Sequence, residues 1–149
     1  MNRRLLGIAV VCLLLAGSYV VGAQVARPYH NGSVWEVAFI RVKPGMDQAY
    51  LSYLAADWKK EQDAQKSEGN ILSYKVLQSE PHNPGDFTLM LMTEYKDLAT
   101  MEANEAKRDA VVQRVIGNDA KQMQGYKDRL EIREVLGSRL AREIVLLPR

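Results

Sequence analysis

The sequence predicts an α+β domain in which four antiparallel strands form one sheet and helices cover one of its faces. Three observations predict this fold. Strand-like and helical stretches follow one another in the order strand, helix, strand, strand, helix, strand; a loop with two prolines is all that separates the second and third strands; and no segment repeats another. Strands joined by such a loop pair antiparallel, and each helix carries the chain back across the sheet.

The first strand and the first helix are predicted between residues 34 and 66. Residues 34–42 are rich in β-branched and aromatic side chains, and Pro44 ends the strand because proline has no backbone N–H to donate. Apolar residues then recur at three- and four-residue steps, as on one face of a helix over residues 46–66. These residues are Met46, Tyr50, Tyr53, Leu54 and Trp58.

The remaining elements are predicted in the second half of the chain. Strands over 71–78 and 87–95 flank a loop and form a hairpin. Asp97 can cap a second helix that runs to residue 116, and a further helical stretch over 119–136 is ended by Gly137. The last strand is predicted over 139–147. The order βαββαβ is that of the ferredoxin-like fold.

The predicted sheet is apolar on both faces, although two helices can cover only one. Phe87, Leu89 and Leu91 point one way along the third strand, whereas Met90 and Met92 point the other way. The last strand shows the same double pattern, with Ile144 and Leu146 opposite Val145 and Leu147. A second copy of the chain is the simplest cover for the free face, so a homodimer is expected; the alternative is that the methionines are half-exposed.

The first 23 residues have the pattern of a signal peptide. Arg3 and Arg4 precede an uncharged apolar run, and Ala23 offers a small residue for cleavage before Gln24. The protein is therefore expected to be exported, to the periplasm or the extracellular space. The alternative is an uncleaved membrane anchor, because residues 5–23 carry no charge. Residues 24–33 are predicted to be a loose lead-in, and residues 34–149 a single domain.

Composition excludes several classes of protein. With Arg3 and Arg4 removed, the 20 basic residues fall to 18 and match the 18 acidic ones, which argues against nucleic-acid binding. Cys12 is the only cysteine, so disulfide scaffolds, cysteine-based zinc sites and iron–sulfur clusters are excluded. The two histidines lack a partner at metal-ligand spacing, and no phosphate loop or dinucleotide fingerprint is present. We therefore expect neither a metal nor a cofactor.

The segment Phe39-Ile40-Arg41-Val42-Lys43-Pro44-Gly45, followed by a helix that opens Met46-Asp47 with Tyr50 and Tyr53 on its inner side, resembles the dimeric α/β-barrel superfamily. That superfamily includes antibiotic-biosynthesis-type monooxygenases and stress-responsive barrel proteins, and the resemblance covers residues 34–147. It implies a homodimer with a ligand pocket between sheet and helices. No catalytic motif of the superfamily matches residue for residue, so the resemblance assigns no catalytic residue.

Large side chains predict a pocket for a small apolar or aromatic ligand. Tyrosine and tryptophan line such pockets, but they also fill cores, and both roles remain open here. The predicted ligand-binding residues are Trp35, Tyr50, Tyr53, Trp58, Tyr74 and Met90.

Two residues are candidates for proton transfer. His82 lies in the hairpin loop and has a reference pKa near neutrality. Glu36 lies in an otherwise apolar strand, where burial would raise the pKa of its carboxyl group. The alternatives are an exposed loop histidine and a structural charge pair.

Three functions follow from these observations. The first is an exported homodimer that binds a small apolar or aromatic molecule. The second is a cofactor-independent monooxygenase or isomerase that acts on such a molecule through His82 or Glu36. The third is a structural or interaction module without catalysis. The missing catalytic motifs favour the first.

Overall fold

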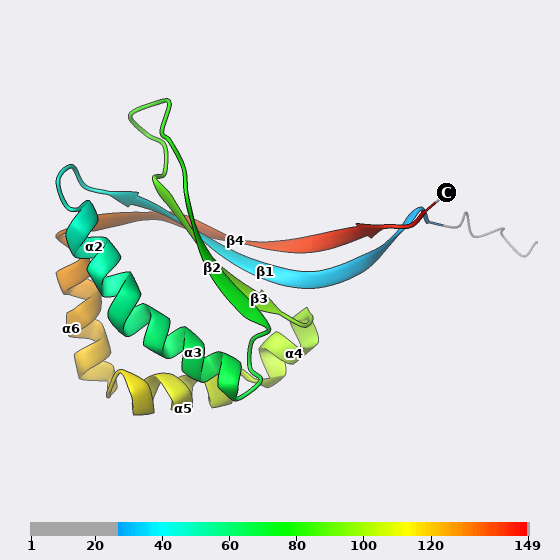
Figure 1. Ribbon diagram of the computed structural model, residues 1–149. Helices are drawn as coiled ribbons and strands as arrows, with labels where there is room; N and C mark the ends of the chain where they lie inside the picture. The colour runs from blue at the N-terminus through cyan, green and yellow to red at the C-terminus, as the bar shows by residue number, and fades with distance from the viewer. Residues whose placement is uncertain (1–26, 149) are drawn as a thin grey trace, which may run out of the picture.

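The computed structural model describes residues 27–148, so the predicted signal peptide and the start of the lead-in lie outside the described residues. Four strands and a set of helices alternate as the sequence predicts (Figure 1). The strands are β1 (Tyr29–Val42), β2 (Ser73–Gln78), β3 (Leu89–Tyr95) and β4 (Arg133–Leu146). The helices are α2 (Asp47–Tyr53), η1 (Leu54–Trp58), α3 (Lys59–Ser67), α4 (Leu98–Ala103), α5 (Glu105–Val115) and α6 (Asp119–Leu130).

The four strands form one antiparallel sheet in the order β2-β3-β1-β4, which confirms the predicted ferredoxin-like arrangement. The predicted hairpin is β2–β3, and the first and last strands of the chain lie side by side. The helices lie on one side of the sheet (Figure 1). Beyond the end of β3, β1 and β4 continue as a two-stranded ribbon (Figure 1).

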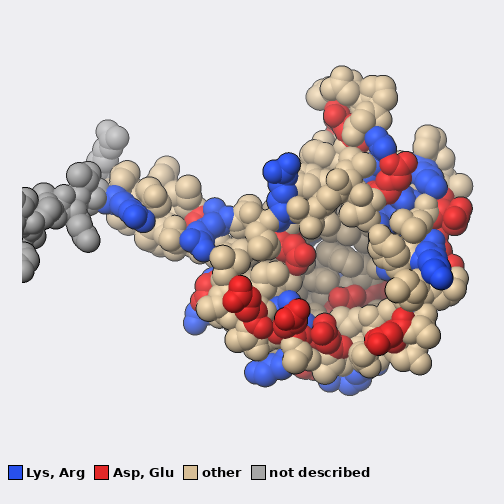
Figure 2. Space-filling model, turned by 180° about the vertical axis from the view of Figure 1, so that it is seen from behind, with Lys and Arg blue, Asp and Glu red and all other residues tan. Residues whose placement is uncertain are grey.

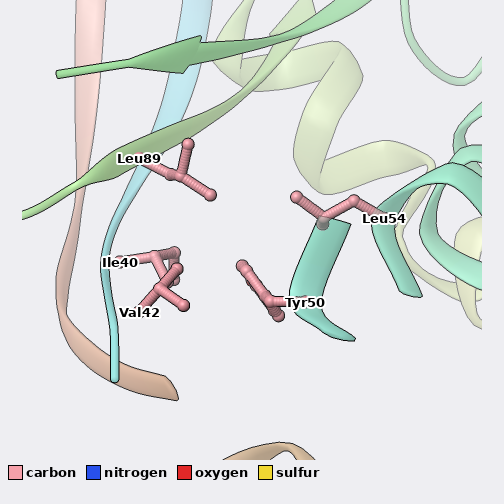
Figure 3. Packing of buried hydrophobic residues seen from close by; sticks show 5 residues of the cluster. All are labelled: Ile40, Val42, Tyr50, Leu54 and Leu89. Carbon is pink, nitrogen blue, oxygen red and sulfur yellow. The ribbon is translucent and has the colours of Figure 1, made fainter. Parts of the chain in front are cut away.

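The hydrophobic core lies between the sheet and the continuous helix formed by α2, η1 and α3. Its centre is a cluster of five buried residues that point toward one another from β1, β3 and the helix (Figure 3). They are Ile40, Val42, Tyr50, Leu54 and Leu89. Alternation along β1 and spacing along the helix bring these side chains together, so the core confirms the predicted helical spacing.

The middle of this helix is a π-helical turn, η1, which holds one more residue per turn than an α-helix. Tyr53, Asp57 and Glu61 are spaced by four residues and flank or occupy this wider turn. All three side chains reach the same cavity, which is described below. Leu54 and Trp58 are also four residues apart, and both pack on the core side of the helix.

The opposite face of the sheet, which we call the open face, carries no helix and is apolar at its centre, between Lys75 of β2 and Arg139 of β4. The strand register places Val37 beside Met92 and Phe39 beside Met90. Val37 is only 7% exposed, and its neighbours are half-buried against one another. The prediction that Phe87 points the same way as Leu89 is wrong. The Phe87 ring lies 4.9 Å from the ring of Phe39 on the open face, because β3 begins only at Leu89.

The prediction of a helix over residues 119–136 is wrong at its end. Helix α6 stops at Leu130, and Arg133 begins β4 by pairing with Val42. Pairing with the long β1 strand overrides the local helical propensity of residues 131–136. Gly137 does not end a helix; it has φ 148° where the β1–β4 register shifts, a conformation that suits glycine at a bulge.

The predicted loose lead-in also differs from the structure, because β1 begins at Tyr29 rather than at residue 34. The turn-favouring residues Asn31 and Gly32 mark a second register shift in the β1–β4 ribbon instead of a loop. The predicted cap is confirmed: the Asp97 carboxylate accepts a hydrogen bond from the Thr100 backbone N–H at 2.6 Å, at the start of α4.

Candidate functional site

The candidate site is a cavity of about 330 Å³ between the helix α2-η1-α3 and the pair α5 and α6. Figure 2 shows this molecule from behind, with a hollow that has acidic side chains inside it and along its lower rim. The volume is in the range of small-molecule pockets. The residues that line the cavity are Tyr53, Asp57, Glu61, Val112, Ile116, Lys121, Gln122, Gln124, Gly125, Asp128 and Arg129.

Two arginines and two tyrosines form a row beside the cavity, which we call the Tyr–Arg row. The guanidinium of Arg129 lies 4.5 Å from the ring centre of Tyr53. The Tyr53 and Tyr50 rings are stacked at 5.8 Å, and the guanidinium of Arg133 lies 5.5 Å from the ring centre of Tyr50. Each cation therefore faces an aromatic ring, an arrangement that partly compensates for lost hydration.

The polar atoms of the two arginines are not fully paired. Arg133 is only 7% exposed, and its Nε and Nη1 atoms are buried without a hydrogen-bond partner, as is Nε of Arg129. Over the described residues, ion pairs join Arg41 to Glu134, Lys59 to Asp63 and Arg114 to Glu68, and none involves these two arginines. Unpaired buried donors of this kind are uncommon in folded proteins.

Burial raises the pKa values of the titratable groups around the cavity. The pKa of Glu61 is raised by burial, and the nearby positive charge of Arg129 opposes the rise. Burial also raises the pKa of Tyr53 and brings that of Tyr50 to about 12, again against the charges of the two arginines. Burial therefore stabilises the neutral forms of this carboxyl group and of the two phenols relative to the same groups in water.

We expect Tyr50 to ionise late in an alkaline titration. Its pKa of about 12 lies above the ordinary value of 10. The neutral phenol therefore contributes its full stabilisation of the folded state below pH 10, and this contribution is lost as the pH rises toward 12. Ultraviolet difference absorbance should show a late phase near pH 12, shared with Tyr95, whose pKa is also about 12. Tyr50→Phe should reduce this phase, whereas Tyr126→Phe should leave it intact. A single phase near pH 10 would contradict the prediction.

The structure distributes the predicted ligand-binding residues over both faces of the sheet. On the helix side, Tyr53 lines the cavity, Tyr50 lies in the core behind it, and Trp58 packs edge-on against Tyr74 at 5.3 Å. The Tyr74 hydroxyl donates a hydrogen bond to Asp63, and hydrogen bonds from Lys59 and then from Tyr74 lower the pKa of that carboxyl group. These four residues lie near one another, but only Tyr53 contributes to the cavity wall.

Trp35 and Met90 lie on the open face instead. The Lys75 ammonium lies 4.2 Å from the centre of the Trp35 ring, and Met90 pairs with Phe39 and Leu77 across the strands. The helices do not reach this side of the sheet (Figure 1). These two residues are therefore placed with the open face rather than with the cavity.

The two proton-transfer candidates lie far apart. Glu36 faces the helix side, where its carboxylate accepts a hydrogen bond from the Tyr95 hydroxyl at 3.1 Å. His82 is exposed in the β2–β3 loop, which projects away from the helices, and its backbone N–H donates to Asp86 (Figure 1). Neither residue lines the cavity.

Sequence reasoning missed Glu61, Arg129 and Arg133. The first two lie in mixed charge runs that look like solvated helix faces, and Arg133 lies where a helix was predicted. One signal was present, namely Gly125 inside a helix, where glycine costs about 1 kcal/mol relative to alanine. A Cβ at this position would lie 3.1 Å from Nη1 of Arg129, so the glycine leaves room for that side chain at the cavity wall.

Residues 27–148 contain no cluster of three or more histidine, cysteine or acidic residues that could hold a metal ion. None of the helices in this part of the chain is long and apolar enough to span a membrane.

Comparisons with known proteins give a fold but no family. No family model matches the sequence, and no curated protein matches it. Among solved structures, the chain is similar to a dimeric ferredoxin-like protein from an uncultured marine organism, with 10% identity and a TM-score of 0.50 over 79% of this chain and 91% of that one. This likeness supports the ferredoxin-like fold.

Two further structures give lower scores. A NIPSNAP family protein of unknown function from Agrobacterium tumefaciens is 16% identical, with a TM-score of 0.48 over 80% of this chain and 94% of that one. A second dimeric ferredoxin-like protein from an uncultured marine organism is 16% identical, with a TM-score of 0.45 over 80% of this chain and all of that one.

Proposed function

We propose that the protein is an exported homodimer that binds a small, partly aromatic molecule in the cavity on the helix side of the sheet. The cavity carries this proposal, because it combines a volume of about 330 Å³ with one aromatic side chain, two apolar side chains and seven charged or amide side chains. Tyr53 supplies the aromatic surface, and Val112 and Ile116 supply the apolar one. Binding needs only this pocket, and a fold alone does not define a reaction.

The homodimer is supported by the open face. Trp35, Val37, Phe39, Met90 and Met92 form one apolar surface across the two central strands. Contiguous apolar surfaces of this kind on soluble proteins mark interaction sites. A second copy presents the same surface, so a two-fold arrangement would cover both sheets at once. The similar marine structure is itself described as dimeric.

Export is supported by the sequence of the first 23 residues, with Arg3 and Arg4 before an apolar run. Amino-terminal sequencing of the protein recovered from an expressing bacterium tests this part of the proposal. A mature chain that begins at Gln24 in the periplasmic or culture fraction supports export. A chain that retains Met1 in the cytoplasm contradicts it.

A proton-transfer enzyme is the second candidate function, and the position of Glu61 favours it. This half-buried carboxyl group lines the cavity, and burial raises its pKa. Groups shifted in this way serve as general acids and bases in active sites. The bound molecule would then be a substrate, as expected for a cofactor-independent monooxygenase or isomerase.

A thermal-shift screen tests the binding function. Flavins, haem, quinones and phenolic compounds should include a ligand that raises the melting temperature, because binding to the folded state stabilises it. Val112→Trp should abolish the shift by filling the cavity, whereas Ala120→Trp, which adds the same side chain on the outer surface of α6, should preserve it. A shift that survives Val112→Trp would contradict binding in this cavity.

A further inference from the structure

The unpaired donors of the Tyr–Arg row suggest which chemical class of ligand the cavity accepts. Arg133 is more than nine-tenths buried, and three guanidinium nitrogens of the row lack an acceptor, namely Nε of Arg129 and both Nε and Nη1 of Arg133. Removing a guanidinium from water is costly unless an anion or a set of acceptors replaces the water. The faces of the neighbouring aromatic rings partly compensate these cations for their lost hydration. The rings accept no hydrogen bond from the N–H groups that lie in the guanidinium plane.

The cavity wall places one of these arginines where a ligand can reach it. Arg129 lines the cavity, and together with Gln122 it also lines a neighbouring depression along α6. Gly125, one turn earlier, has no side chain that would fill the space beside the guanidinium. Arg129 therefore lies at the cavity wall, and Arg133 adds a second positive charge behind the tyrosines.

The cavity lining also holds three carboxylates, Asp57, Glu61 and Asp128, beside the cations Lys121 and Arg129. Asp57 and Asp128 are exposed and therefore hydrated, so their influence on the interior is screened. Glu61 is closer to the interior, but it forms no ion pair with Arg129. Charges in a region of low dielectric act more strongly than hydrated ones, so the interior of the cavity next to the row favours an anion.

We infer that the cavity binds a small organic carboxylate, whose carboxylate group accepts hydrogen bonds from Arg129 while its apolar body lies against Tyr53. A carboxylate is planar and matches the fork of a guanidinium, which makes it a better partner than a spherical ion. Tyr53 presents its ring to the same cavity, and Val112 and Ile116 supply the apolar wall. This inference rests on the proposed binding function and specifies the charge of the ligand.

Three probes of similar size and different charge test the inference on the full-length protein. They are benzoate, which is anionic, benzamide, which is neutral, and benzylamine, which is cationic. Benzoate at millimolar concentration should raise the melting temperature and give a measurable dissociation constant by calorimetry, and the other two should bind at least about tenfold more weakly, since hydrogen bonds to charged groups are the stronger ones.

Variants of α6 assign the effect to Arg129. Arg129→Met should weaken benzoate binding by about tenfold to a hundredfold. Arg129→Lys should give an intermediate loss, because lysine keeps the charge but lacks the planar fork. Lys127→Met removes an exposed cation from the same helix and should leave benzoate binding unchanged. Arg129→Lys keeps the test valid if Arg129→Met does not fold.

The outcomes separate this inference from the proposed function. Equal benzoate affinity in the wild type and both Arg129 variants would overturn the inference, as would a preference for benzamide or benzylamine. In the latter case the cavity would still bind a small aromatic molecule. Failure of all three probes and of every compound in the thermal-shift screen would overturn both the inference and the proposed function.

Discussion

Met92→Glu is expected to turn the protein from a dimer into a monomer. Met92 lies on the open face between Val37 and Lys75, at the centre of the apolar surface proposed to meet a second copy. A carboxylate enclosed at such an interface loses its hydration, so the dissociation constant of the dimer should rise by about a hundredfold or more. In the monomer the new carboxylate can pair with Lys75, so the subunit should remain folded.

Sedimentation velocity and circular dichroism together check this result. The wild type should sediment as a dimer at micromolar concentration and Met92→Glu as a monomer, both with the same circular dichroism spectrum. Leu51→Glu introduces the same charge at a position that is 46% exposed on α2, and it should leave the dimer intact. A monomeric wild type, or a Met92→Glu variant that sediments as a dimer, would contradict the proposed role of the open face.

Ile40→Ala should cause the largest loss of stability. Ile40 is 2% exposed and lies at the centre of the core cluster, where it faces Tyr50 and Leu89. Removing this much buried side chain costs the hydrophobic transfer energy and leaves a cavity, about 2–5 kcal/mol in total. A loss of this size is a large part of the free energy of unfolding of an ordinary domain.

Urea unfolding at one fixed protein concentration measures this loss, because association would add a concentration dependence. Leu146→Ala is the control, since Leu146 is 76% exposed in the β1–β4 ribbon and its truncation should change the free energy of unfolding by less than about 0.5 kcal/mol. A similar cost for the two variants would show that Ile40 does not lie in a close-packed core.

The sequence predicts the fold well where its patterns are local. The steps of three and four residues from Tyr50 to Trp58 predict the core-facing helix, and Asp97 marks a helix start that the structure confirms. The predicted end of the further helical stretch, over residues 119–136, is wrong because the chain from Arg133 onward pairs with β1, far away in sequence. Pairing between distant segments leaves no local signal in a single chain.

The candidate site was predicted only in part. Aromatic residues on the inner face of the first helix indicate a binding region, and Tyr53 does line the cavity. The sequence alone does not place Arg129 and Arg133 beside those tyrosines, because charged residues on a helix are usually hydrated and their burial depends on how α6 meets β4. The assignment of Glu36 and His82 to proton transfer stays a prediction.

The pairing of the first strand with the last has a consequence for biosynthesis. β1 occupies a central position in the sheet, and one of its two edges is completed only by β4, the final strand. A ribosome makes β1 before β4, so this edge of the sheet closes only after β4 has been synthesised. A polypeptide whose sheet closes this late is suited to being threaded through a membrane channel, which fits the export proposed for this protein.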